Sequence, residues 1–177
     1  MDSGFVYDDG GREAAGYKGA TGDCVTRSIA IATGRPYQEV YDALNALAVT
    51  ERTGRRKRKK SNARTGVYKN TTRRYMESIG WEWTPTMAIG SGCKVHLCAD
   101  ELPAGRLVVA VSRHLTAVID GVIHDIYDPR RAKSYMFEPD RGQALRDGQG
   151  RNENGVWTEI GGRCVYGYFS KGESNNV

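Results

Sequence analysis

The 177-residue chain has few cysteines, few histidines and no long apolar run. Its four cysteines are too few and too dispersed for a disulfide framework, and no basic-then-apolar signal segment begins the sequence. We therefore expect reduced thiols and a cytoplasmic protein. The longest apolar runs, LVVAV and LTAVI, are far shorter than the roughly 20 residues that cross a bilayer, so no membrane partner is expected. A chain of this length suits a single domain, 1–177, with its own core.

Acidic residues are absent from one stretch, 52–74, which holds 11 of the 26 Lys and Arg residues. The rest of the chain carries 15 basic and 21 acidic residues, so this segment alone makes the protein basic. The stretch RRKRKK within this segment has no apolar periodicity, which predicts that residues 52–74 form a basic insertion. Cations in such a run can neutralise phosphates. The segment therefore suits either a solvated loop or a surface that binds nucleic acid or an acidic protein. The expected contact residues are Arg55, Arg56, Lys57, Arg58, Lys59 and Lys60.

Apolar spacing predicts three helices in the first half of the chain. Residues 24–33 and 37–47 each keep a helical stripe. Gly34 is a stop signal for the first helix, and Pro36 suits the first position of the second. The stretch NTTRRYMESIG predicts a third helix, with Asn70 as its cap.

Short β-branched runs follow and predict strands. They are RLVVAVS, HLTAVID, GVIHDIYD and RCVYGYF. Helices followed by an antiparallel sheet are typical of an α+β fold. Two regions are expected to lie outside this core: a flexible, Gly- and Asp-rich N-terminal arm (1–21), and a polar loop or flap (130–156).

The dipeptide Asp120-Gly121 separates two of the predicted strands. It is the sequence that a two-residue type I′ turn prefers, because both central residues need positive φ. Such a turn fixes the pairing register. It places His114 and Asp125 diagonally on one face of the hairpin and His124 on the other. Asp125 can therefore orient the imidazole of His114.

Cys24 stands at the predicted start of the first helix, in GDCVTRSIA. The positive end of a helix dipole lowers a thiol pKa and offers N–H donors to an oxyanion, which suits a nucleophile. A small buried hydrophobe is the alternative interpretation of a lone cysteine. With His114 as base and Asp125 as orienting residue, Cys24 completes a nucleophile, base and orienter set. The sequence thus predicts acyl transfer that needs no metal or organic cofactor.

Two stretches, GDCVTRSIA and HLTAVIDGVIHDIYDP, resemble the papain-like cysteine peptidase superfamily. In that superfamily a cysteine begins a helix, a histidine begins a later strand, and an Asp or Asn lies on the next strand. The first stretch is similar to the GDC signature of ovarian-tumour-type deubiquitinases. The second is similar to the end of bacteriocin-leader-processing peptidases, and that likeness implies Asp128 as the alternative third residue. The resemblance implies a papain-like fold and hydrolysis of a peptide or isopeptide bond.

The sequence is also similar to small phage proteins that carry GDC near the start and DGVIHD in the second half. This likeness implies a phage protein that acts in the host cytoplasm. One position departs from the papain-like pattern: the Gln six residues before the cysteine, which serves the oxyanion hole, is Lys18 here. The Cys24 N–H would then act with Lys18, Thr21 or the N–H of Asp23. The alternative function is an inactive papain-like scaffold that binds its partner through the basic segment.

The sequence CKVHLC brings Cys93, His96 and Cys98 close together, and these are zinc-ligand types. Their spacing is poor for zinc, because His96 would point away from Cys93 in a strand and Cys164 would have to supply a distant fourth ligand. We therefore expect no metal site and interpret these cysteines as ordinary core residues.

Overall fold

A computed structural model describes residues 4–19, 21–55, 59–130, 149–151, 157–159 and 163–172. Three helices lie in the first half: α1 (Cys24–Thr33), α2 (Tyr37–Val49) and α3 (Lys69–Ser78). The strands are β1 (Phe5–Tyr7), β2 (Trp81–Pro85), β3 (Arg106–Val111), β4 (His114–Ile119), β5 (Val122–Asp125), β6 (Gln149–Arg151), β7 (Trp157–Glu159) and β8 (Val165–Lys171). The presence of both helices and strands confirms the expected α+β class.

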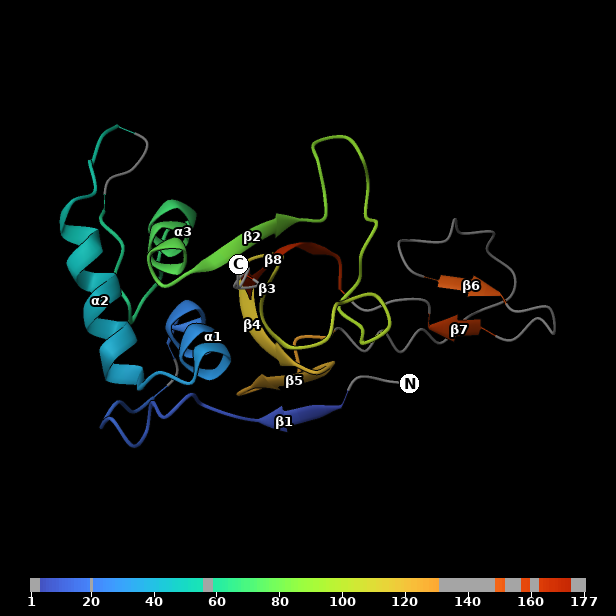
Figure 1. Cartoon of the computed structure of the whole chain (residues 1–177), viewed down its shortest axis with the longest axis horizontal. Coiled ribbons are helices and arrows are strands. Elements are labelled where there is room, and N and C mark those ends of the chain that lie inside the picture. The colour runs from blue at the N-terminus through green and yellow to red at the C-terminus, as the bar shows by residue number, and fades with distance from the viewer. Residues whose placement is uncertain are drawn as a thin grey trace, which may run out of the picture.

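Six strands form one sheet in the order β1-β5-β4-β3-β8-β2, while β6 and β7 pair with each other. All neighbours in the large sheet are antiparallel except β1, which runs parallel to β5. Figure 1 shows the sheet curving from β2 at one edge to β1 at the other, with α1 against its middle strands and α3 near β2. The expectation of N-terminal helices packed on a C-terminal antiparallel sheet is only partly right, because β1 precedes the helices and runs parallel to β5.

The β4–β5 hairpin has the predicted turn and register. Asp120 has φ 48° and Gly121 has φ 80°, as both central residues of a type I′ turn require. Ile119 pairs with Val122, and His124 lies opposite Ala117. The prediction of this register is confirmed.

Two apolar clusters cover opposite faces of the sheet, because neighbouring strand residues point to alternate sides. The first joins the helices to the sheet and includes Val25, Ile29, Val40, Leu44, Val108, Ala117 and Phe169. The second includes Leu97, Leu102, Leu107, Val109, Val118, Ile123 and Val165. Since Leu97 and Leu102 come from the connection between β2 and β3, this connection covers the face that the helices leave open.

Two expected boundaries need correction. Part of the predicted arm, Phe5–Tyr7, is strand β1, since its backbone pairs with β5. The end of the basic segment lies in the predicted third helix, because Lys69–Arg74 belong to α3, and ahead of it Asn62 bridges to Gly66. Within the predicted flap, 149–151 form β6, while 131–148 and 152–156 lie outside the described residues.

Two helix starts also differ by a residue or two from the prediction. Pro36 is the N-cap of α2 rather than its first helical residue. The N-cap of α3 is Tyr68, so Asn70 lies inside the first turn and does not cap the helix. Both predicted starts lie within two residues of the observed ones, because local backbone geometry rather than apolar spacing decides where a helix begins. None of the helices in the described residues combines the length and apolarity needed to cross a membrane.

Candidate active site

The three predicted catalytic residues come together where the start of α1 meets one end of the sheet. Because β4 and β5 are antiparallel, the first residue of β4, His114, and the last residue of β5, Asp125, lie at the same end of the sheet. Cys24 is the first residue of α1, and α1 packs along β4. The fold therefore brings three residues that are far apart in sequence into one place.

His114 joins the other two side chains. Its Nε2 lies 2.7 Å from Oδ2 of Asp125, and both residues are buried. The Cys24 side chain also interacts with the ring, and Nδ1, the nitrogen that does not face Asp125, lies 3.2 Å from the Tyr127 hydroxyl. Burial lowers the pKa of His114, but the hydrogen bonds and negative charges of Asp125 and Cys24 outweigh it and raise the pKa to about 9.

The Cys24 thiol is half-buried at the helix N-terminus. Burial is the largest effect and raises its pKa. The hydrogen bonds from His114 and the backbone of Leu115, with the positive charges of His114 and Arg27, together outweigh burial and hold the pKa below its usual value. A lowered thiol pKa beside a raised imidazole pKa favours a thiolate–imidazolium pair.

Arg27 is a buried cation that sequence reasoning missed. It is 2% exposed, and its guanidinium bridges two carboxylates: Nη1 lies 2.6 Å from Oδ1 of Asp125, and Nε lies 3.0 Å from Oδ1 of Asp23. The other oxygen of Asp23 accepts a 2.8 Å hydrogen bond from the hydroxyl of Tyr37. A signal was present in the sequence, because Asp23 and Arg27 have the i,i+4 spacing of a helical ion pair at the start of an otherwise apolar helix.

Tyr127 also contacts the candidate site and was not singled out as functional. Its hydroxyl lies 3.2 Å from Nδ1 of His114, and the two ring centroids are 5.1 Å apart. Tyr127 is 49% exposed, so it lies at the solvent side of the site. Burial and the negative charges of Asp125 and Cys24 raise its pKa, which keeps the hydroxyl protonated.

Asp128, the alternative third residue, lies beyond the end of β5 and is exposed. Its carboxylate pairs with Arg130, with Oδ2 2.7 Å from Nη2. Burial raises its pKa, but the hydrogen bonds and charge of Arg130 outweigh burial and lower it. Asp125 rather than Asp128 is the carboxylate in contact with His114.

The three expected oxyanion donors lie before α1 and are engaged in different ways. The Thr21 hydroxyl donates to the carbonyl of Arg64, and the exposed Lys18 accepts from the Arg64 guanidinium through its own carbonyl. The Asp23 side chain is buried against Arg27 and Tyr37. The Thr21 hydroxyl is therefore engaged by Arg64, while the donor expected at Asp23 is its backbone N–H rather than this side chain.

The expected partner-binding residues lie between α2 and α3. Arg55, Lys59 and Lys60 are exposed, and the Nζ of Lys60 donates to the Val49 carbonyl. Arg56, Lys57 and Arg58 lie outside the described residues. The described cations of this loop are therefore available to solvent but belong to a different part of the molecule from β5, where Asp125 lies (Figure 1).

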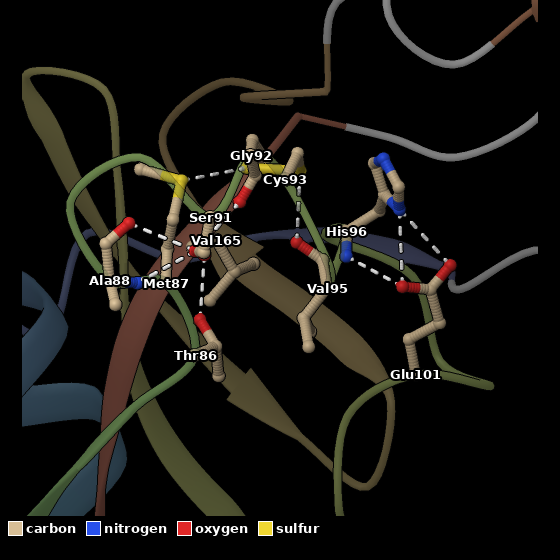
Figure 2. Close-up of a disulfide and its surroundings, with 11 residues drawn as sticks. Thr86, Met87, Ala88, Ser91, Gly92, Cys93, Val95, His96, Glu101 and Val165 are labelled. Atoms are coloured by element: carbon tan, nitrogen blue, oxygen red, sulfur yellow. Dashed lines mark hydrogen bonds and ion pairs between the residues drawn. A yellow bond between two sulfur atoms is a disulfide. The ribbon is translucent and has the colours of Figure 1, made fainter.

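The structure corrects the expectation that all four cysteines are reduced. Cys93 and Cys164 form a disulfide with Cα atoms 5.8 Å apart, and Figure 2 shows it between the β2–β3 connection and the start of β8. Nearby, Nδ1 of His96 lies 3.1 Å from Oε2 of Glu101 (Figure 2). The disulfide engages two of the four zinc-ligand candidates, and the described part of the chain holds no group of three or more His, Cys, Asp or Glu side chains that could bind a metal ion. Cys24 and Cys98 are the free thiols.

Comparisons with known proteins give no match that decides the family. No protein-family model matches the chain, and no curated protein and no solved structure is significantly similar to it. The function must therefore be argued from the geometry and electrostatics of the site.

Proposed function

We propose that this protein is a cysteine-dependent acyl-transfer enzyme with a papain-like arrangement, which hydrolyses a peptide or isopeptide bond. The observation that carries the proposal is the buried His114, whose Nε2 lies 2.7 Å from Asp125 and which also interacts with Cys24, the first residue of α1. A nucleophile, a base and a residue that orients the base are the groups such a reaction requires.

In the proposed reaction the Cys24 thiolate attacks the substrate carbonyl carbon and forms a tetrahedral intermediate. Backbone N–H groups at the start of α1 stabilise its oxyanion. As the C–N bond breaks, Nδ1 of the imidazolium gives its proton to the leaving amine. Water then attacks the thioester, its proton passes to Nδ1 of His114, and the thiolate leaves. Asp125 holds the ring through Nε2 during both steps.

The alternative is an inactive scaffold that binds nucleic acid or an acidic protein through the basic loop. The exposed cations Arg55, Lys59 and Lys60 are the observation behind it. The two hypotheses differ in what they require of Cys24, since only the enzyme needs its thiol.

Turnover of a mixed library of fluorogenic peptide amides tests the proposal. We expect hydrolysis by the wild-type protein and its loss in Cys24→Ala. The melting temperature should stay nearly constant, because removing one half-buried sulfur costs much less than the roughly 2–5 kcal/mol of a large core truncation. Turnover that survives in Cys24→Ala would contradict the proposal. A large fall in melting temperature would mean that Cys24 is a packing residue.

A further inference from the structure

A continuous row of alternating charges runs from the segment before α1 to the candidate base. Arg27 is its centre, with Asp23 on one side and Asp125 on the other, and His114 follows Asp125. The side chains of Arg27 and both carboxylates are at most 3% exposed. Such charges attract one another strongly because water screens them little.

The geometry of Asp125 shows what Arg27 contributes. Each carboxylate oxygen has its own cation: Oδ2 faces His114 and Oδ1 faces Arg27 at 2.6 Å. Oδ1 also accepts the N–H of Ile126 at 2.8 Å. A planar guanidinium that holds a second acid, Asp23, cannot turn without breaking a buried contact. The carboxylate plane, and with it the imidazole ring, is therefore fixed from the helix that begins with Cys24.

We infer that Arg27 is a positioning residue, which ties the Asp125 carboxylate to helix α1 and so fixes the imidazole of His114 beside Cys24. The inference rests on the proposed function. The Arg27 side chain hydrogen-bonds Asp23 and Asp125 rather than the thiol, so its effect on Cys24 passes through Asp125 and through its charge. Burial of the guanidinium is offset by its contacts with Asp125 and Asp23, so its pKa stays raised and the charge is permanent.

Several other groups face this cluster and set the background against which Arg27 acts. Arg12 and Arg64 lie 3.7 and 3.8 Å from Asp23, and Tyr37 hydrogen-bonds it. Tyr127 faces His114 from beyond β5. None of these is a second bridge between Asp23 and Asp125. Loss of the Arg27 charge should therefore raise the pKa of Cys24, because one of the cations that lower it is gone.

Alkylation of Cys24 by the neutral reagent iodoacetamide, followed by peptide mass spectrometry from pH 4 to 10, tests this without a substrate. In Arg27→Gln the midpoint of the pH profile should move up by about half a pH unit or more, which means about threefold slower labelling on the acidic side. Arg27→Lys keeps the charge and should restore much of the low midpoint. Arg73 offers the matched control, because its Nε pairs with Glu77 at the same i,i+4 spacing on an exposed helix face. Arg73→Gln and Arg73→Lys should leave the pH profile of Cys24 alkylation unchanged.

If Arg27→Gln does not fold, the double variant Asp23→Asn/Arg27→Gln also removes the buried Asp23 carboxylate, which has lost its 3.0 Å contact with Arg27, and is measured in its place. A variant that melts earlier but keeps the wild-type midpoint would overturn the inference and leave Arg27 a purely structural residue. A midpoint that moves as far in Arg27→Lys as in Arg27→Gln would also overturn it. Wild-type Cys24 that labels no faster than Cys98 near neutral pH would overturn the proposed function itself, and the inference with it.

Discussion

Replacing Asp125 by Asn probes the contact that joins the candidate base to its orienting residue. The pKa of His114 is raised to about 9 from an ordinary 6.5, and the hydrogen bond to Asp125 is the largest of the effects that raise it. The difference corresponds to about 3 kcal/mol in favour of the imidazolium. Asn keeps the shape of Asp125 but removes its charge, while the burial that lowers the pKa of His114 remains. We expect the pKa of His114 to fall in Asp125→Asn, because the largest effect that raises it is lost.

The ring signals of His114, followed by NMR over pH 4 to 11, measure this pKa directly. The chain has only three histidines, so His96→Gln and His124→Gln complete the assignment. Asp128→Asn is the matched control, because Asp128 pairs with Arg130 and does not touch His114. Turnover should fall by about 100-fold or more in Asp125→Asn, since the imidazole loses both its orientation and its charge partner. A titration of His114 that is unchanged in Asp125→Asn, or that moves in Asp128→Asn, would refute this reasoning.

Two further predictions concern parts of the chain outside the site. Replacing residues 55–60 with Gly and Ser should leave the melting temperature and turnover nearly unchanged and should abolish any nucleic-acid binding. The affinity of the wild-type protein for duplex DNA should fall with salt, with a log–log slope of about −0.9 per neutralised phosphate. If the wild-type protein binds no nucleic acid even at low salt, an acidic protein is left as the partner. Replacing both Cys93 and Cys164 by Ser should lower the free energy of unfolding by about 4 kcal/mol, because the disulfide closes a loop between residues 71 positions apart. Equal midpoints of urea unfolding for the wild-type protein and the double variant would contradict this.

The hairpin that carries His114 and Asp125 was predictable because its register follows from two residues. Asp120-Gly121 specifies a two-residue turn, and once the turn is fixed the alternation of a strand decides which side chains share a face. The position of Cys24 was predictable for a similar reason, since Gly34 and the apolar spacing locate helix α1. The residues that meet at the end of the sheet could therefore be named from local patterns.

Other features depend on contacts that local patterns do not encode. The bridge from Asp23 through Arg27 to Asp125 depends on the contact between Arg27 and Asp125, which are 98 residues apart in sequence. The pairing of Cys93 with Cys164 likewise joins distant segments, and cysteine spacing does not give connectivity. Strand β1 was missed because three residues beside Gly- and Asp-rich sequence carry too little apolar alternation to predict a strand. Its place in the sheet comes from pairing with β5.

The reactivity of Cys24 relative to Cys98 in the wild-type protein tests the central claim most directly. These are the two free thiols, and they have opposite environments: the pKa of Cys24 is lowered, whereas burial and the charge of Glu101 raise the pKa of Cys98. Cys98 is therefore an internal reference in the same sample. Iodoacetamide at pH 6.5 should label Cys24 at least about tenfold faster than Cys98, because only the thiolate reacts. Equal labelling of the two, or faster labelling of Cys98, would contradict a thiolate–imidazolium pair at Cys24 and His114.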